Sequence, residues 1–301
     1  MNTLITGGNG LIGSFMNFGL KPTKKELNLL NYTELKSYIE NKNINSIVHM
    51  AAKVGGVQGN TKYIFDFFLE NMIINTNIFR VCQEYNIKKS LFLISTCAFP
   101  KNAPLPLEEK SLHTGEPHET NYGYAYAKRM IEVGSRSLKQ QYDIHSNCLI
   151  PCNLYGGNDN YNLENGHVIP SLIHKCYLAK LNNTVFEIWG SGKAEREFVY
   201  AKDIADIIFM ITDNNFLIDG SMIISPDDIF TIEEIVNHIV KIMNFKGKVF
   251  FDSSKPEGIL KKNSSNKKFK QYFPDFKFTD LETGLALTVE YFLQNYESIR
   301  K

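Results

Sequence analysis

Tyr124 and Lys128 are the first residues whose types and spacing suggest chemistry. If residues 121–128 are helical, side chains four apart lie on one face, so the phenol and the ammonium can share a pocket. A phenol with an ordinary pKa of roughly 10 exchanges protons poorly at neutral pH. A cation a few ångströms away in a low-dielectric pocket would lower that pKa by favouring phenolate. The pair predicts a general acid beside a carbonyl, although such spacings also arise by chance.

The elements that would position this pair begin with a short β-prone segment at residues 2–6. It runs directly into a Gly-x-x-Gly-x-x-Gly motif and a predicted helix start. Glycines in this context let the backbone approach a pyrophosphate, whose charge is met by the helix N-terminus. We therefore expect a dinucleotide cofactor to contact Gly7, Gly10, Leu11, Ile12 and Gly13.

The stretch after the glycine motif is unusually short. Before residue 26 there is room only for a stunted helix and little or no second strand, since a normal helix needs about ten residues. Glu26 lies near the position at which an acidic residue favours NAD by binding the ribose 2′-hydroxyl. Lys21, Lys24 and Lys25 crowd the same place and could hold a 2′-phosphate, or could simply form a solvated surface. We favour NADPH.

Residues 46–52 have the apolar character of a buried parallel strand. The strand ends in the small residues Ala51 and Ala52, where a backbone can pass close to a cofactor. We interpret His49 as a hydrogen-bonded strand residue rather than a catalyst.

Residues 91–94 form another apolar strand, which ends at Ser95. A strand terminus would place the Ser95 hydroxyl beside the cofactor, so Ser95 is our candidate for a second donor to the reacting oxygen, with Thr96 as its competitor. Strands and helices alternate in this way to about residue 155. This alternation predicts an α/β fold with a Rossmann-type doubly wound parallel sheet.

Two domains are expected. Residues 1–160 should form a dinucleotide-binding domain, to which a later segment near 198–225 returns. Beyond residue 160 the pattern loosens, so residues 161–301 should mainly form a smaller mixed α/β lobe that binds substrate. Within it, residues 261–270 are polar and basic and predict a mobile loop.

Composition narrows the class of protein. The 301 residues are 43% hydrophobic and 22% charged, as in ordinary globular proteins, and the net charge of +1 gives no general attraction for nucleic acid or membranes. Five cysteines without a C-x-x-C pair argue against a disulfide framework or a zinc site, so we expect no metal. No apolar run approaches the length of a membrane span. We expect a cytoplasmic protein.

Further short stretches narrow the function. They are Ala-Ala-Lys-Val-Gly-Gly at 51–56, Ser-Thr-Cys at 95–97, Asn-Leu-Tyr-Gly at 153–156, Gly-His-Val-Ile-Pro at 166–170, Trp-Gly-Ser-Gly at 189–192, Arg-Glu-Phe at 196–198 and Ser-Lys-Pro-Glu-Gly at 254–258. Taken in order with the glycine motif, they resemble the GDP-L-fucose synthase family of extended short-chain dehydrogenases/reductases. The resemblance covers nearly the whole chain.

This resemblance implies an NADPH-dependent enzyme that reduces the C4 ketone of a GDP-4-keto-6-deoxy sugar and epimerises C3 and C5. Ser95, Tyr124 and Lys128 match the family's reductase triad, and Cys97 with His167 match its epimerisation acid/base pair. Cofactor contacts are implied at Lys24, Asn28, Leu29, Ala51, Ala52 and Lys128, and substrate contacts at Asn153, Val168, Lys175, Trp189, Arg196 and Lys255. The fold family also suggests a homodimer through the helices around 72–84 and 122–140.

The chain also departs from the family's pattern. Asn9 stands where family members carry an arginine for the 2′-phosphate, and Lys24 replaces a second arginine. Two alternatives therefore stay open. One is a C4-reductase without epimerase activity that acts on a GDP-4-keto-6-deoxy-heptose or another hexose after a separate epimerase. The other, of a different class, is a non-catalytic NADP-binding regulator.

Overall fold

The computed structural model describes residues 2–55, 57–214, 216–255 and 258–301. Gly56, Pro256 and Glu257, which contribute to two of the family-like stretches, lie outside the described residues. The chain divides into two compact units. Unit 1 consists of Met1–Pro104, Glu108–Pro151 and Ile204–Ile224, and unit 2 of Leu105–Leu107, Cys152–Asp203 and Ser225–Lys301.

A five-stranded parallel sheet forms the core of unit 1. Its order is β1 (Thr3–Thr6), β2 (Ser46–His49), β3 (Lys89–Leu93), β4 (Ser146–Pro151) and β9 (Ser221–Ile224), and every pairing is parallel. All residues of β1, β2 and β9 are buried, as expected for strands covered on both faces. The predicted Rossmann-type doubly wound parallel sheet is confirmed.

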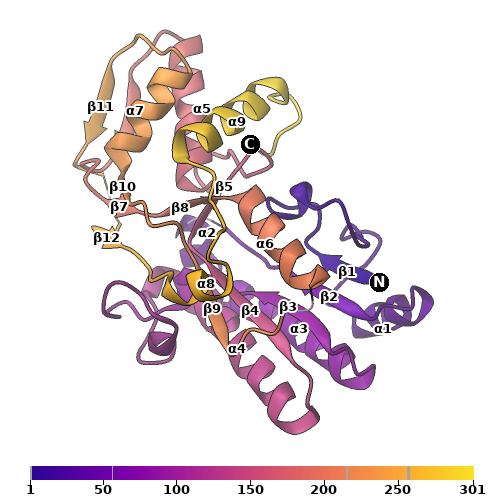
Figure 1. Cartoon of the computed structure of the whole chain (residues 1–301). Helices are drawn as coiled ribbons and strands as arrows, with labels where there is room; N and C mark the ends of the chain where they lie inside the picture. The colour runs from indigo at the N-terminus through magenta and orange to yellow at the C-terminus, as the bar shows by residue number, and fades with distance from the viewer. Residues whose placement is uncertain (1, 56, 215, 256–257) are drawn as a thin grey trace. The chain divides into compact units, whose positions relative to one another are not determined.

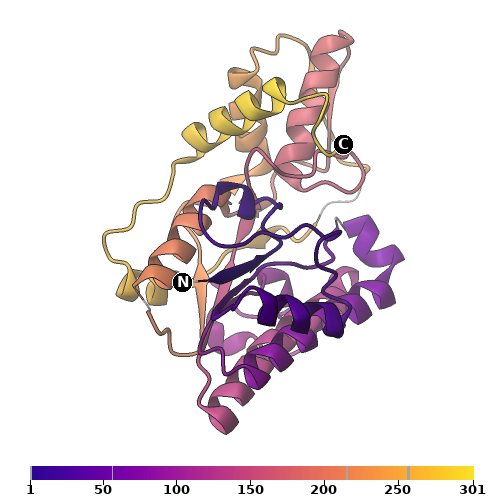
Figure 2. The same ribbon diagram turned by 90° about the vertical axis from the view of Figure 1, so that its right-hand side faces the viewer.

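Helices cover both faces of this sheet (Figures 1 and 2). On one face, α3 (Ile64–Glu84) and α4 (Tyr122–Tyr142) lie side by side, and α1 (Tyr32–Asn41) packs along α3. On the opposite face lies α6 (Ala201–Asp213). The short elements of unit 1 are α2 (Val57–Lys62) and the 3-10 turns η2 (Thr96–Ala98), η3 (Glu109–Ser111) and η4 (Glu119–Asn121).

The predicted shortening after β1 is confirmed. The first helix is reduced to a single 3-10 turn, η1 (Gly13–Phe15), and the second strand to one residue, Leu20, which bridges β1. Leu20 accepts a hydrogen bond from the Ile5 N–H and donates one to the Thr3 carbonyl oxygen, both 2.8 Å long. The Lys21 ammonium donates to the carbonyl oxygens of Gly13 (3.3 Å) and Met16 (2.6 Å). One lysine thus ties the end of the glycine loop to the chain that follows it.

The described part of unit 2 contains three small sheets. Strands β5 (Asn153–Tyr155) and β8 (Phe198–Tyr200) pair in parallel, as do β6 (Phe186–Trp189) and β11 (Val249–Asp252). The third sheet has the order β10 (Phe230–Thr231), β7 (Glu195–Arg196) and β12 (Lys261–Lys262). Helices α5 (Val168–Leu181), α7 (Ile232–Ile242) and α9 (Leu281–Gln294) pack around them. This mixture of short strands and helices matches the mixed α/β pattern expected after residue 160.

The prediction of a mobile loop at residues 261–270 is wrong. This segment contains β12 and most of α8 (Lys267–Tyr272). The reason is Phe269, which is fully buried and stacks on Phe273 with ring centroids 5.3 Å apart. Phe276 and Phe278 close the same aromatic cluster at 5.7 and 5.3 Å from Phe269. The polar composition of the segment predicts a loop, but the burial of Phe269 orders it.

Candidate active site

The loop between β1 and η1 carries the predicted dinucleotide contacts. Gly7 has a φ of 72°, and a Cβ there would lie 2.8 Å from the backbone nitrogen of Ala51, so only glycine fits. A Cβ on Gly10 would meet open space apart from the Gly7 oxygen at 3.1 Å. The N–H groups of Leu11 and Ile12 have no acceptor within the described part of the chain. Unpaired N–H groups beside an open glycine surface fit the pyrophosphate of a dinucleotide.

The segment before α1 contains the residues predicted to hold the adenosine. Lys24 is exposed, and the Asn28 side chain accepts a hydrogen bond from the Leu30 N–H at 3.2 Å. The carbonyl oxygen of Leu29 accepts a hydrogen bond from the side chain of Asn77, a buried residue of α3, at 2.8 Å. Asn77 was not predicted from the sequence, because one amide in an apolar helical pattern does not reveal its partner.

Helix α4 carries Tyr124 and Lys128 one turn apart, as predicted. The Lys128 ammonium is buried and donates a hydrogen bond to the carbonyl oxygen of Leu93, the last residue of β3, at 2.8 Å. Burial lowers the pKa of Lys128 to about 8. The lysine is thus fixed at the carboxyl end of β3 and titrates close to neutrality.

Ser95 and Cys97 lie in the turn that follows β3. The Ser95 hydroxyl caps η2 by accepting a hydrogen bond from the Cys97 N–H at 3.2 Å. Ser95 and Cys97 are half-buried, whereas Thr96 is buried. Ser95 is also close enough to the Tyr124 phenol to lower its pKa, and Cys97 is close enough to raise it. The structure therefore brings Ser95, Cys97, Tyr124 and Lys128 together at the carboxyl edge of the sheet.

The expected acidification of Tyr124 by Lys128 is wrong. Burial raises the pKa of the Tyr124 phenol well above its ordinary value, the nearby Cys97 raises it further, and Ser95 lowers it. The Lys128 charge is not among these causes, since its ammonium is directed to the Leu93 carbonyl oxygen. Tyr124 is therefore a neutral phenol at physiological pH, which is the form that can donate a proton.

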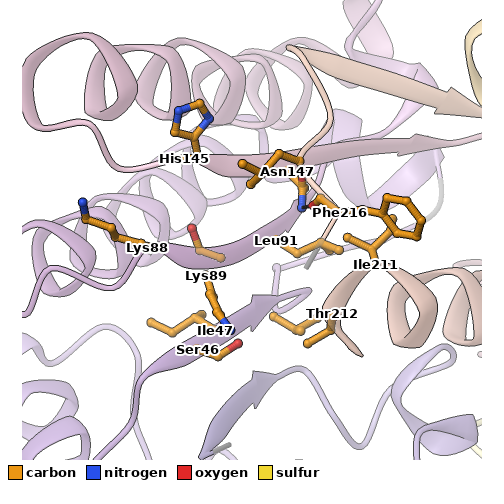
Figure 3. A pocket seen from close by; sticks show the side chains of 13 residues that line it. Ser46, Ile47, Lys88, Lys89, Leu91, His145, Asn147, Ile211, Thr212 and Phe216 are labelled. Atoms are coloured by element: carbon orange, nitrogen blue, oxygen red, sulfur yellow. Dashed lines mark hydrogen bonds between the residues drawn. The ribbon is translucent and has the colours of Figure 1, made fainter. Parts of the chain in front are cut away.

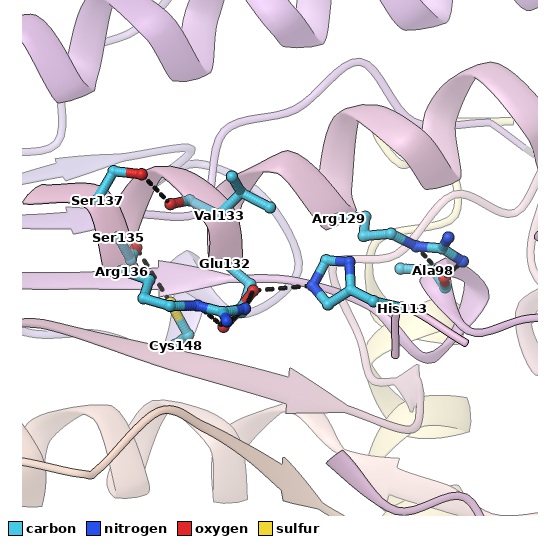
Figure 4. A network of polar contacts seen from close by, with 9 residues as sticks. All are labelled: Ala98, His113, Arg129, Glu132, Val133, Ser135, Arg136, Ser137 and Cys148. Carbon is cyan, nitrogen blue, oxygen red and sulfur yellow. Dashed lines mark hydrogen bonds and ion pairs between the residues drawn. The ribbon is translucent and has the colours of Figure 1, made fainter. Parts of the chain in front are cut away.

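Arg129 connects α4, which carries Tyr124 and Lys128, to the turn η2, which begins after Ser95. It was not predicted from the sequence. Its buried guanidinium donates to the carbonyl oxygen of Ala98 (Figure 4). It also donates to the carbonyl oxygen of Gly115. The next arginine along the helix, Arg136, instead pairs with Glu132 at the surface. The two arginines are indistinguishable in sequence, because only the fold shows which one turns inward.

His49 is hydrogen-bonded, as predicted, and lies in a buried polar chain. Its Nδ1 lies 2.8 Å from the Thr6 hydroxyl and its Nε2 lies 3.1 Å from the Asn75 side-chain oxygen. The Asn75 amide in turn donates to the Ala127 carbonyl oxygen of α4 at 2.9 Å. Burial, followed by the Lys128 charge, lowers the pKa of His49 to about 3. The imidazole is therefore neutral and links β1, β2, α3 and α4.

In unit 2, His167 lies at the N-terminus of α5 and contacts an acidic residue that was not predicted from the sequence. Its Nδ1 lies 3.0 Å from Oδ1 and 3.3 Å from Oδ2 of Asp159. Asp159 is 3% exposed, whereas the His167 side chain is 47% exposed. The imidazole thus has one nitrogen against a buried carboxylate while much of the side chain stays accessible.

Three of the residues predicted to bind the nucleotide sugar lie close together in unit 2. The Lys175 ammonium lies 4.7 Å from the centre of the Trp189 ring, a cation–π contact, and burial lowers the pKa of this lysine. Trp189 ends β6 opposite Asp252 of β11, and the Lys255 N–H bonds back to the Asp252 carbonyl oxygen at 3.1 Å. Lys175, Trp189 and Lys255 are thus grouped around the carboxyl ends of two parallel strands.

The other predicted substrate contacts lie on neighbouring elements of unit 2. The Arg196 guanidinium lies against Gly258, so that a Cβ on that glycine would be 3.2 Å from it. The Asn153 amide donates to the carbonyl oxygen of Glu197 at 2.8 Å, and Val168 is exposed in the first turn of α5. Their roles in binding remain predictions.

A cavity of about 220 Å³ lies elsewhere in unit 1 (Figure 3). It is lined by the first residues of β2 and β3, including Ser46 and Lys89, and by Ile211 and Thr212 near the end of α6. These are the amino ends of the strands, opposite to the edge where Ala51 and Ser95 lie. Open α/β sheets bind their ligands at the carboxyl edge. No predicted site residue that the structure describes lines this cavity.

Among the residues that the structure describes, no group of three or more His, Cys, Asp or Glu side chains is arranged to hold a metal ion. Over the same residues, none of the helices combines the length and the apolar character that crossing a bilayer requires.

The parallel sheet, the glycine loop and the Ser95–Tyr124–Lys128 cluster define a nucleotide-dependent short-chain dehydrogenase/reductase fold. The model of the NAD dependent epimerase/dehydratase family matches residues 3–222, and the chain belongs to this family.

More specific similarity comes from individual relatives. The chain is 40% identical to a GDP-L-fucose synthase of Dictyostelium discoideum, with 99% of this chain and 97% of the relative covered. It is 34% identical to a probable GDP-L-fucose synthase of Drosophila melanogaster over 99% of each chain. Among solved structures, a GDP-L-fucose synthetase of Naegleria fowleri bound to NADP superimposes with a TM-score of 0.93 at 35% identity, over 99% of this chain and 94% of that chain.

Proposed function

We propose that this protein is an NADPH-dependent enzyme that reduces the C4 ketone of a GDP-4-keto-6-deoxy sugar and epimerises C3 and C5, as GDP-L-fucose synthases do. The observation that carries this proposal is the grouping of Ser95, Cys97, Tyr124 and Lys128 at the carboxyl edge of the sheet. Full-length similarity to GDP-L-fucose synthases supports the nucleotide sugar, and the NADP-bound relative supports the cofactor.

The reduction follows from the donors in unit 1. Bound NADPH supplies a hydride to C4. Tyr124 donates its proton to the C4 oxygen, and the Ser95 hydroxyl donates a hydrogen bond to the same oxygen, so the negative charge that develops there is neutralised as it forms. Lys128 donates a hydrogen bond to the Leu93 carbonyl oxygen and so holds α4, with Tyr124, against the end of β3. The neutral phenol therefore serves as the acid.

Epimerisation can use the same donors. The protons on C3 and C5 both flank the C4 carbonyl, so Tyr124 and Ser95 can also stabilise the enolate that forms when either proton leaves. Cys97 and His167 supply the base and the acid. A thiol with an ordinary pKa of about 8.5 and an imidazole of about 6.5 can exchange protons near neutrality.

We also propose that the two parts of the chain bind different ligands. Residues 1–160, with the segment near 198–225, bind the dinucleotide through the glycine loop, Lys24, Asn28 and Leu29. Residues 161–301 mainly bind the nucleotide sugar. Lys175 and Trp189 support this assignment, since a base can stack on an exposed ring while a cation attracts phosphate. Arg196 and Lys255 are proposed diphosphate ligands.

We further propose a cytoplasmic homodimer. All five cysteines are free, in keeping with a reducing compartment. Apolar side chains are exposed on the two helices that pack together, Phe65 and Leu69 on α3 and Tyr122 and Val133 on α4, and such a surface favours self-association. Sedimentation of the protein at micromolar concentration tests this, and a purely monomeric species would contradict it.

The decisive experiment offers GDP-4-keto-6-deoxymannose in D₂O. Without NADPH, the enzyme should incorporate deuterium at C3 and C5, and with NADPH it should release the epimerised and reduced sugar. Reduction without deuterium incorporation would instead indicate a C4-reductase that follows a separate epimerase, and a panel including a 4-keto-heptose would identify its substrate.

A Tyr124→Phe variant tests the proposed acid. It should bind NADPH normally, and its reduction rate should fall about 10²- to 10⁴-fold. A Tyr124→Phe protein that behaved like the parent in every assay would indicate a non-catalytic NADP-binding regulator.

A further inference from the structure

The contact between Asp159 and His167 fixes the tautomer of the imidazole. An ionised carboxylate can only accept hydrogen bonds, so the hydrogen between the two groups is carried by Nδ1 of His167. Both carboxylate oxygens lie within 3.3 Å of this nitrogen. The neutral ring then carries no hydrogen on Nε2, and this second nitrogen is the basic one.

The loop that carries Asp159 is anchored on several sides. The Asn160 N–H donates to Asp159 Oδ1 at 2.7 Å, and the next residue, Tyr161, is fully buried. Arg300 accepts a hydrogen bond from the Tyr161 N–H and donates one to the Asn158 carbonyl oxygen, both 2.8 Å long. The carboxylate is therefore held in place by the backbone around it and does not depend on His167 for its position.

The charge of Asp159 also affects the pKa of Tyr161, which lies two residues further along the chain. Burial raises the pKa of Tyr161 far above its ordinary value, and the Asp159 charge raises it further. Tyr161 thus stays a neutral phenol, directed to the Gly157 carbonyl oxygen at 3.0 Å. Of Tyr161 and His167, only His167 has an accessible side chain, so Tyr161 does not compete with it for a ligand's proton.

We propose that Asp159 is a positioning residue for the proposed epimerisation, holding His167 as the Nδ1–H tautomer so that Nε2 exchanges the proton with the sugar carbon. This inference rests on the proposed function. When Nε2 takes a proton from carbon, the C–H electron pair enters the enolate, and the imidazolium that forms is stabilised by the carboxylate. When Nε2 returns a proton, the enolate pair forms the new C–H bond and the ring becomes neutral again.

A purely structural role for Asp159 makes a different prediction. Buried carboxylates are often retained only because they satisfy nearby N–H groups, here those of Asn160 and His167. Its replacement would then lower stability without changing the protonation pattern of the ring. The tautomer and the exchange rate separate the two roles.

The test compares Asp159→Asn with the matched control Glu164→Gln, which removes one charge from an exposed position on the same loop. ¹⁵N NMR of histidine-labelled full-length protein reports the tautomer, with the His167 resonances assigned by their absence in His167→Gln. Deuterium incorporation into GDP-4-keto-6-deoxymannose without NADPH reports proton exchange. NADPH affinity and the thermal midpoint report folding.

We expect the Nδ1–H tautomer in the parent and in Glu164→Gln, and its loss in Asp159→Asn. Proton exchange by Asp159→Asn should slow roughly 10- to 100-fold, the range found for carboxylate partners of functional histidines, with NADPH affinity within about twofold. An Nε2–H tautomer in the parent protein would overturn the inference without any variant. So would parental exchange in Asp159→Asn while His167→Gln is slow, which leaves the proposed function intact. Parental exchange in His167→Gln would overturn the role of His167 itself.

Discussion

Arg129 of α4 donates two hydrogen bonds, of 2.6 and 3.1 Å, to the carbonyl oxygen of Ala98, the last residue of the turn that begins after Ser95. A third, of 2.8 Å, goes to the Gly115 carbonyl oxygen. A guanidinium is a rigid planar fork, so it fixes both position and angle between the groups it joins. The separation of Tyr124 on the helix from Ser95 on the turn therefore depends on Arg129.

Arg129→Lys should lower both stability and turnover. One ammonium cannot reproduce the fork that spans Ala98 and Gly115, so the free energy of unfolding should fall by about 2 to 4 kcal/mol, given 1.5 to 3 for each lost charged hydrogen bond and partial replacement by lysine. Reduction should slow about tenfold, because small misplacements of catalytic groups are costly. Urea unfolding and steady-state kinetics measure these effects.

Arg136→Lys is the matched control for this change. The same substitution two turns along α4 alters only a surface pair with Glu132 and should change stability by less than about 1 kcal/mol. Equal losses in the two variants would show that Arg129 has no special position.

Lys128 should set the alkaline limit of the reduction rate. Its pKa of about 8 means that the ammonium is charged below this pH and neutral above it, so the charge-assisted hydrogen bond to Leu93 that holds α4 against β3 weakens as pH rises through 8. The pH profile of kcat should therefore fall on the alkaline side with a midpoint near 8. Lys128→Arg, whose guanidinium stays charged, should retain part of the activity and lose this midpoint. An unchanged limb in that variant would assign the titration to another group.

His49 should make the fold sensitive to acid. Its pKa is about 3 in the folded chain and near 6.5 when unfolded, so only the unfolded state takes up a proton between these values. The contribution of neutral His49 to the free energy of unfolding is complete above pH 6.5 and is lost as the pH falls toward 3. At pH 4.5 the loss amounts to about 2 to 3 kcal/mol. His49→Gln, although less stable at pH 7, should lose less stability between pH 7 and 4.5 than the parent. Parallel urea unfolding curves for both proteins check this, and equal losses would contradict it.

Lys175 and Trp189 should act on substrate affinity rather than on chemistry. Lys175→Met should raise KM for the GDP sugar about tenfold with little change in kcat, because it removes a partly buried cation that is held against the ring. Trp189→Ala should do the same, since a stacked base is worth about 1 to 3 kcal/mol. KM for NADPH should stay unchanged in both variants. Lys180→Met, on the same helix but bonded to the Met243 carbonyl oxygen, serves as control and should leave both KM values alone.

The sequence was sufficient for the parts of the fold that follow from local patterns. Apolar runs predicted the parallel strands, the glycine motif predicted the loop after β1, and the four-residue spacing placed Tyr124 and Lys128 on one helix face. The shortened segment after Gly13 could be predicted because chain length alone forbids a full helix and strand there.

What the sequence did not reveal depends on tertiary direction. Nothing local distinguishes the inward Arg129 from the outward Arg136, or marks Asp159 as the buried member of a polar loop. The pKa of Tyr124 was misjudged for a related reason, because spacing gives the face of the helix but not the acceptor that draws the Lys128 ammonium away. The helix at Lys267–Tyr272 was missed because one buried phenylalanine outweighed a polar composition.

Leu20 shows how the sheet tolerates its missing strand. A terminal β-strand normally exposes unpaired backbone groups that can recruit another chain and lead to aggregation. Here one residue occupies the Thr3 oxygen and the Ile5 nitrogen on the outer side of β1, and Pro22, two positions later, cannot donate to a ladder. The second strand is reduced to one residue and the first helix to a single turn. Even so, few backbone groups on the outer side of β1 remain free to pair with a strand of another chain.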